Sequence, residues 1–148
     1  MRQAPEADLL ALPHEEIRFA HNSERQFAKL LDFYGVAWEY EPTEFILEHD
    51  RQGNPSQAFR PDFYLPAYDL YIEITTLNQK LVTKKNRKVR RLTELHPEVK
   101  VKIFYQRDYL RLLVKYGLEQ PSQLVDQLDD AEPRPLDFSM PDEVVAGS

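Results

Sequence analysis

The chain has no cysteine, which excludes a disulfide framework, a zinc knuckle and thiol catalysis. Glycine is scarce, at 4 of 148 residues, and the sequence has neither a Gly-rich phosphate-binding loop nor a Gly-x-Ser-x-Gly motif. No apolar run approaches the ~20 residues that span a bilayer. The N-terminal residues lack the apolar segment of a secretory signal. We therefore expect a cytoplasmic protein without a membrane partner.

Histidines with metal-ligand spacing are also missing, because the four histidines are scattered and form no His-x-x-x-His pair. What the chain does have is an ordinary apolar content of 42% and 11% aromatic residues, which indicate a folded domain rather than a disordered chain. Its length suits one domain with a real hydrophobic core.

The charges are unevenly distributed along the chain. The net charge is −6, yet residues 80–115 carry twelve Lys or Arg against three Asp or Glu. A polyanion responds to such a local field more than to the net charge, so this segment is a candidate nucleic-acid contact. A solvated helix face is the alternative explanation for the same run of charges.

Apolar periodicity and turn residues predict the order of helices and strands. The predicted helices run from Asn22 or Ser23 to about Phe33 with Gly35 ending it, from residues 76–78 to about Leu95, and over Tyr109–Tyr116. The predicted strands cover residues 36–40, 44–47, 58–63, 68–75 and 99–105. A strand, a helix and a strand in that order favour a parallel pair with a right-handed connection.

The fold class predicted from this order is α/β, with a mixed central sheet of four to five strands flanked by helices. We expect an N-terminal arm over residues 1–20, the folded domain over residues 21–117, and a C-terminal region over residues 118–148. That last region starts with a short helix over residues 121–128. From Asp129 onward prolines and acids dominate, which predicts disorder.

Two acids stand at the centre of the predicted sheet. Asp62 follows Pro61 near the end of one strand, and Glu73 lies within the apolar strand that comes next. Neighbouring strands are ~4.8 Å apart, so the two carboxylates can share one divalent cation. A carboxylate in an apolar strand is costly to bury unless a metal, an arginine or a lysine offsets its charge. Glu24 lies on the apolar face of the first helix. It either points into a cleft near these two acids or is a first-turn acid that the helix dipole stabilises.

These residues are arranged as in a known family. The order Ser23-Glu24 on a helix, Pro61-Asp62, then Glu73-Ile74-Thr75 on a strand followed by a helix resembles the PD-(D/E)XK, or restriction-endonuclease-like, nuclease superfamily. The Trp38–Pro42 segment before Arg60-Pro61-Asp62-Phe63 is also similar to small phage and transposon-type members. The resemblance covers roughly residues 22–115. It implies a restriction-endonuclease-like core and a Mg²⁺-dependent (or Mn²⁺-dependent) endonuclease that hydrolyses phosphodiester bonds in DNA.

The resemblance also implies roles for individual residues. Asp62, Glu73 and the Ile74 carbonyl would hold the metal, which would activate a water molecule and neutralise the scissile phosphate. Glu24 would lie further out or hold a second ion. The family's catalytic lysine is replaced by Thr75, and the lysine of some members has moved to the following helix, where Lys80, Lys84 and Lys85 lie in this chain. Lys80 and Lys84 are the candidates, with Lys80 slightly favoured because it is nearest in sequence.

Nucleic acid would lie along the second predicted helix, through the phosphate-binding side chains Lys84, Lys85, Arg87, Lys88 and Arg91. DNA is the expected substrate and RNA an alternative. One site in a small domain cuts one strand, so a homodimer or a larger complex is expected for duplex cleavage. Two other functions are open: an inactive nuclease-fold module that binds nucleic acid or a protein partner, and an adaptor whose acidic tail docks another protein.

Overall fold

A computed structural model describes residues 12–76, 79–119 and 133–140. Its helices are the 3₁₀ turn η1 (Pro13–Glu15), α2 (Asn22–Tyr34), α3 (Gln79–Leu95) and α4 (Gln106–Lys115). Its strands are β1 (Glu39–Tyr40), β2 (Phe45–His49), β3 (Pro55–Phe59), β4 (Phe63–Leu65), β5 (Leu70–Thr75) and β6 (Val101–Tyr105). None of the helices in these described residues is long and apolar enough to cross a membrane.

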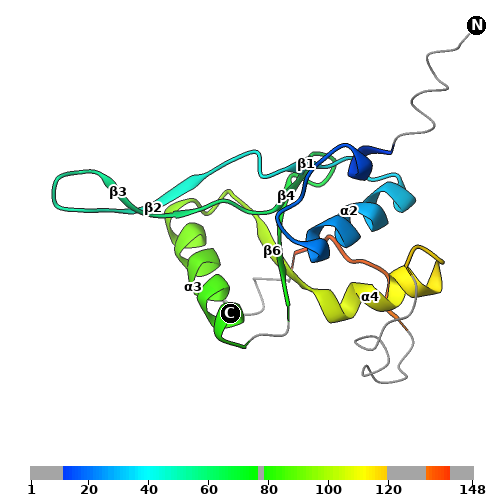
Figure 1. The fold of residues 1–148 in the computed structure, drawn as a ribbon. Helices are drawn as coiled ribbons and strands as arrows, with labels where there is room; N and C mark the ends of the chain where they lie inside the picture. Colours follow the sequence, from blue (N-terminus) through cyan, green and yellow to red (C-terminus); the bar gives the residue numbers. More distant parts are fainter. Residues whose placement is uncertain (1–11, 77–78, 120–132, 141–148) are drawn as a thin grey trace, which may run out of the picture.

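The main sheet has four strands in the order β1-β4-β5-β6. β4 pairs antiparallel with β1 and with β5, whereas β5 and β6 are parallel and are joined through α3 (Figure 1). The predicted mixed α/β class and the predicted parallel pair are therefore confirmed. A second, two-stranded sheet of β2 and β3 forms a hairpin that projects from the main sheet (Figure 1).

Hydrophobic side chains lie on both faces of the main sheet. On one face, α2 and α4 pack around a cluster that includes Phe27, Phe63, Ile72 and Tyr109. On the other face, α3 and the hairpin form a smaller cluster of Leu47, Phe59, Leu92 and Val101. Successive strand residues point to opposite faces, so β5 supplies apolar side chains to both clusters. The sheet is thus covered on both sides, and its polar residues Glu73 and Thr75 are buried.

The prediction for the first helix is confirmed at both ends. α2 begins at Asn22, and Gly35 follows it with φ of 73°, a left-handed conformation that glycine adopts without a Cβ clash. The Gly35 N–H bonds to the Asp32 carbonyl and closes the last turn. His21 occupies the N-cap position and makes no side-chain capping bond.

The strand predicted over residues 58–63 is two strands, β3 and β4, separated by Arg60-Pro61-Asp62. Pro61 has no N–H to donate, so the ladder is interrupted there and the chain passes from the hairpin to the main sheet. This break places Asp62 directly at the start of β4. The strand predicted over residues 36–40 is also shorter, because only Glu39 and Tyr40 pair, with Tyr64 and Phe63.

Part of the C-terminal region is packed, contrary to the predicted disorder from Asp129. Within residues 133–140, the side chains of Leu136, Phe138 and Met140 pack against the larger cluster. The Lys102 ammonium on β6 donates hydrogen bonds to the carbonyls of Asp137 and Ser139, at 2.6 and 2.7 Å. Leu136, Phe138 and Met140 alternate with polar residues, and they provide apolar surface that a purely acidic tail could not bury. The helix predicted over residues 121–128 lies outside the described residues.

The predicted N-terminal arm also contacts the domain where the structure describes it. The backbone N–H of His14 donates to Asp32 at 2.9 Å, and its ring Nδ1 lies 2.7 Å from the same carboxylate oxygen. Phe19 packs against Trp38 and Tyr40 at ring-centroid distances of 5.9 and 4.8 Å. The domain therefore begins before the predicted boundary at residue 21.

The packing of residues 133–140 is testable by truncating one ring. Phe138→Ala removes contacts with Tyr68 and Phe104, whose rings lie 4.9 and 5.9 Å from that of Phe138. We expect the free energy of unfolding in urea to fall by about 1–2 kcal/mol, because half-buried aromatic surface returns to water. Arg134→Ala, at an exposed position in the same segment, is the control and should change it by less than about 0.5 kcal/mol. Equal stability of Phe138→Ala and the unaltered protein would show that the segment is not docked.

Candidate functional site

Asp62 directly precedes β4 and Glu73 lies on β5, and the register of these two strands pairs Phe63 with Ile72. Each carboxylate bonds to the other's strand: Asp62 Oδ2 accepts the Ile74 N–H at 2.8 Å, and Glu73 Oε1 accepts the Asp62 N–H at 3.2 Å. Both residues are 7% exposed. These reciprocal bonds hold two carboxylates in the interior at the point where the chain enters β4.

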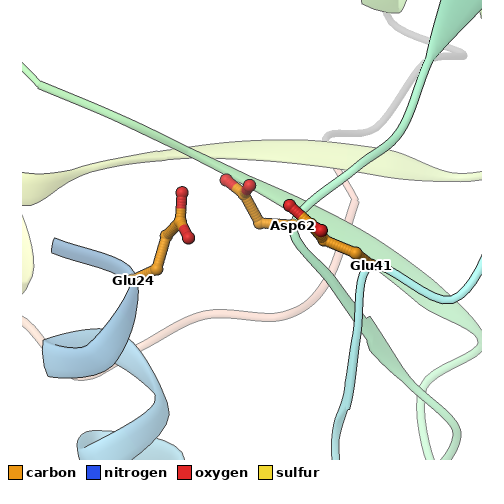
Figure 2. A group of neighbouring side chains, drawn as sticks. All are labelled: Glu24, Glu41 and Asp62. Carbon is orange, nitrogen blue, oxygen red and sulfur yellow. The ribbon is translucent and has the colours of Figure 1, made fainter. Parts of the chain in front are cut away.

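Glu24 approaches the same point from the first turn of α2 (Figure 2). Its side chain is buried, with 5% of the residue exposed, and its Oε1 accepts a hydrogen bond from the Tyr40 hydroxyl at 2.5 Å. Both sequence interpretations of Glu24 therefore hold, since it is an acid in the first turn of α2 and its side chain is directed into the protein.

Glu41 is a member of the site that the sequence analysis missed. One carboxylate oxygen from each of Glu24, Glu41 and Asp62 lies within 4.8 Å of the other two (Figure 2). Glu41 directly follows β1 and donates its N–H to the Asp62 carbonyl at 2.8 Å. Its φ is 48°, a left-handed conformation that is uncommon for a residue with a side chain and costs of order 1 kcal/mol. An acid just before Pro42 was visible in the sequence, but this backbone conformation was not.

The acids divide differently from the prediction. Asp62 groups with Glu24 and Glu41, whereas Glu73 lies outside this group of three in the described structure. Glu73 Oε2 instead lies 3.2 Å from the ammonium of Lys85. The cation predicted between Asp62 and Glu73 stays a prediction, and the group of Glu24, Glu41 and Asp62 is a second place where acids gather.

Lys85 on α3 is the lysine that reaches the carboxylates. Its ammonium contacts Glu73 and donates a hydrogen bond to the Ile74 carbonyl, the backbone oxygen that the resemblance assigns to the metal. Lys80 and Lys84, the two lysines favoured from the sequence, are exposed. On this geometry the preference for Lys80 and Lys84 is replaced by Lys85. Buried Thr75, which stands where the family has its lysine, has its hydroxyl 3.4 Å from the Thr76 carbonyl.

The sequence did contain a signal for Lys85. It follows Val82 by three residues and precedes Val89 and Leu92 by four and seven, which is the spacing of one helix face. Val82 and Leu92 are buried and Val89 is half-buried, so this face packs towards the sheet. A lysine at that position extends inward, whereas Lys84 is rotated away from it.

The electrostatics of the site disfavour three bare carboxylates. Burial, followed by the charges of Glu73 and Glu24, raises the pKa of Asp62 from 3.8 to about 8, although the Ile74 N–H and Lys85 act in the opposite direction. Burial also raises the pKa of Glu73, and the Lys85 ammonium opposes this shift. Tyr109, fully buried behind the site, donates its hydroxyl hydrogen to the Ser23 carbonyl, and its pKa is raised well above its usual value by burial and by the charges of Asp62 and Glu24. Without a cation, burial and the neighbouring acids therefore favour the protonated form of Asp62.

These residues fit a divalent metal ion. Mg²⁺ prefers carboxylate oxygens at 2.0–2.1 Å, so two opposite ligand atoms lie about 4.2 Å apart. The oxygens of Glu24, Glu41 and Asp62 lie within 4.8 Å of one another, so shifts of about 1 Å would let them surround one ion. A cation between them would offset the burial and the neighbouring charges that raise the pKa of Asp62. The donor type is the one that hard divalent cations take.

The predicted nucleic-acid surface is divided by the rotation of α3. Lys84 and Arg87 are exposed, and Arg91, half-buried, lies 3.4 Å from Glu94. Lys88 is half-buried, with its ammonium 3.4 Å from the Ala58 carbonyl on the hairpin, and Lys85 belongs to the acidic site. Of the five predicted side chains, therefore, Lys84, Arg87 and Arg91 remain on the outer side of the helix.

Comparison of the chain with protein-family models, with curated proteins and with solved structures found no match. The resemblance to the PD-(D/E)XK nucleases therefore stays a prediction based on the order of Glu24, Asp62 and Glu73. The geometry of the site has to be interpreted from its own chemistry.

The raised pKa of Asp62 predicts how stability depends on pH when no metal is present. The folded protein holds a proton on Asp62 between its unfolded pKa near 4 and about 8, so the free energy of unfolding should fall by a few kcal/mol as pH rises through this range. Asp62→Asn cannot ionise and should remove the part of that fall that comes from Asp62, so that the variant loses less stability between pH 5 and pH 8 in EDTA than the unaltered protein. Urea unfolding at pH 5 and pH 8 measures the effect.

The control for this experiment is Asp108→Asn, an exposed acid in the first turn of α4. It should keep the same pH dependence as the unaltered protein. Parallel pH profiles for Asp62→Asn and the unaltered protein would contradict the assignment of the proton to Asp62.

Proposed function

We propose that this protein is a metal-dependent endonuclease that hydrolyses phosphodiester bonds in DNA, with Mg²⁺ or Mn²⁺ as its cofactor and a restriction-endonuclease-like core. The observation that carries the proposal is the group of buried Glu24, half-buried Glu41 and buried Asp62 beside the Glu73–Lys85 ion pair. A divalent ion bound by carboxylates can activate water and stabilise the charge of a phosphodiester during cleavage, and a nearby lysine adds a positive charge.

Each residue has a distinct role in this proposal. Glu24, Glu41 and Asp62 hold the ion, and the Ile74 N–H fixes the orientation of the Asp62 carboxylate. The ion, when bound, activates water as a nucleophile and neutralises charge on the scissile phosphate. Glu73 pairs with the Lys85 ammonium and directs it to the site. The fold brings these groups together from α2, β1, β4, β5 and α3.

Lys85 takes the place of the lysine that Thr75 replaces. A lysine ammonium has three N–H donors, and in the described structure Lys85 uses two of them on Glu73 and the Ile74 carbonyl. The third is available for the attacking water or a phosphate oxygen, where a positive charge stabilises the developing negative charge. The lysine reaches the site from the helix rather than from β5.

The substrate would be bound through phosphates by the outer cations of α3, namely Lys84, Arg87 and Arg91. Such contacts position a nucleic acid without reading its sequence. Cleavage of both strands of a duplex would require a second copy of the chain or a larger complex, because one centre serves one strand.

An inactive nucleic-acid-binding module is the second candidate. One observation favours it: the Lys85 ammonium neutralises Glu73 and bonds to the Ile74 carbonyl, which removes two of the three metal ligands implied by the resemblance. In that case nucleic acid would bind with no product formed. Incubation with plasmid, linear and branched DNA and with RNA, in Mg²⁺ or Mn²⁺, distinguishes the two functions.

For the nuclease, Asp62→Ala and Glu73→Ala should each abolish Mg²⁺-dependent cleavage, because one removes a metal ligand and the other the partner of Lys85. Lys85→Met should lower the rate of the cleavage step by about 10²-fold or more, the usual effect of losing one stabilising donor. Gel assays under single-turnover conditions measure each rate.

Lys84→Met is the matched control, since it removes the same charge from the adjacent, outward-facing position. At saturating DNA it should retain the single-turnover rate. Cleavage that survives Asp62→Ala would place the active centre elsewhere, and loss of activity in Lys84→Met with full activity in Lys85→Met would reverse the assignment of the lysine.

DNA binding should weaken with salt according to the number of phosphates contacted. In EDTA, the logarithm of the association constant should fall with the logarithm of salt concentration with a slope of about −0.9 per contact. Replacing Lys84, Arg87 and Arg91 by Gln should reduce this slope by about one for each residue. Fluorescence anisotropy with a labelled duplex gives both quantities. Lys115→Gln, an exposed cation at the end of α4, is the control, and a slope that the triple replacement leaves unaltered would exclude this face of α3.

A further inference from the structure

The hydroxyl of Tyr40 lies between the start of α2 and the end of β1. It accepts a hydrogen bond from the Ala20 N–H at 3.1 Å and donates one to Glu24 Oε1 at 2.5 Å. The ring is held in an edge-to-face contact with Phe19, at a centroid distance of 4.8 Å, and lies 5.6 Å from Phe63. Packing and hydrogen bonding together fix the position of this hydroxyl.

The direction of the bond to Glu24 follows from the chemistry of its neighbours. A backbone N–H can only donate, so the Ala20 amide takes a lone pair of the hydroxyl and leaves its hydrogen for Glu24. The distance of 2.5 Å is that of a short hydrogen bond between a hydroxyl and a carboxylate.

This bond limits how Glu24 can bind an ion. A carboxylate coordinates a cation through one oxygen or through both. Ca²⁺ takes 6–8 oxygens and readily accepts both oxygens of one carboxylate, whereas Mg²⁺ requires six ligands in a near-ideal octahedron and takes one. Because one lone pair of Glu24 Oε1 accepts the Tyr40 hydroxyl, coordination of one ion through both oxygens of this carboxylate is disfavoured. Glu24 then offers one ligand oxygen to the group formed with Glu41 and Asp62.

We propose that Tyr40 is a positioning residue that, through Glu24, makes the metal centre select small octahedral cations over Ca²⁺. This inference rests on the metal centre of the proposed function. Tyr40 has no contact with the ion in this scheme. Its effect is to keep Glu24 a one-oxygen ligand, so that the centre offers too few oxygens for Ca²⁺.

The test uses the full chain and metal ions alone, without DNA. Tyr40→Phe keeps the ring and its packing on Phe19 and removes only the hydroxyl. Dissociation constants for Mg²⁺, Mn²⁺ and Ca²⁺ are measured by calorimetry, with free Mn²⁺ followed by electron paramagnetic resonance in competition. We expect the affinity for Ca²⁺ relative to Mg²⁺ to rise by about tenfold in Tyr40→Phe, the scale on which partners of metal ligands act.

Two further variants keep the result interpretable. Tyr34→Phe makes the same chemical change at the other end of α2, where the hydroxyl bonds to that of Tyr116 at 3.4 Å, and should leave the ratio unchanged. Glu24→Asp withdraws the carboxylate from Tyr40 by one methylene and should shift the ratio in the same direction as Tyr40→Phe. Urea unfolding in EDTA confirms that each variant is folded.

The outcomes separate the two proposals. If the unaltered protein binds Mg²⁺ or Mn²⁺ and the Ca²⁺ ratio stays constant in Tyr40→Phe and Glu24→Asp, Tyr40 has no part in selectivity, while the proposed nuclease function stands. If the unaltered protein binds none of the three ions, the metal centre itself is wrong, and the role of Tyr40 is overturned with it.

Discussion

Burying several carboxylates within a few ångströms of one another is the constraint on which the rest of this structure depends. An ionised carboxylate in a protein interior raises the free energy of folding unless a donor, a cation or a proton offsets it. Three of the acids have their own partners. Asp62 accepts the Ile74 N–H, Glu73 pairs with Lys85, and Glu24 accepts the Tyr40 hydroxyl. The partners come from different helices and strands, so the tertiary fold and the acidic site form together. What these donors leave uncompensated is the burial of Asp62 and its repulsion by Glu73 and Glu24, which a divalent ion would offset.

Helix α3 divides its positive charge between two tasks. Lys85, on the face that packs against the sheet, compensates a buried acid, while Lys84, Arg87 and Arg91 lie on the outer side. A chain with a net charge of −6 can in this way present cations to a polyanion and still hold a cluster of acids. The same helix links the two parallel strands, so one β-α-β unit places both Lys85 and its partner Glu73.

The sequence predicted what depends on local pattern. The end of α2 at Gly35 and the parallel pairing around α3 follow from periodicity, a helix-ending glycine and the connection rule. Lys85 was equally predictable from its spacing to the apolar residues of its helix, but distance along the chain favoured other lysines. Glu41 was not predictable, since its place depends on a left-handed backbone fixed by tertiary contacts. The composition of residues 133–140 predicts a disordered tail. It does not reveal that Leu136, Phe138 and Met140 pack against the larger hydrophobic cluster.

The position of the cation is the central claim, and diffraction from crystals grown with Mn²⁺ tests it most directly. Anomalous scattering locates manganese independently of any assumption about the ligands. We expect one strong peak about 2.2 Å from oxygens of Glu24, Glu41 and Asp62, with Lys85 still paired with Glu73. A peak bound by other side chains, or crystals in which the three carboxylates close on a shared proton with no manganese between them, would contradict it.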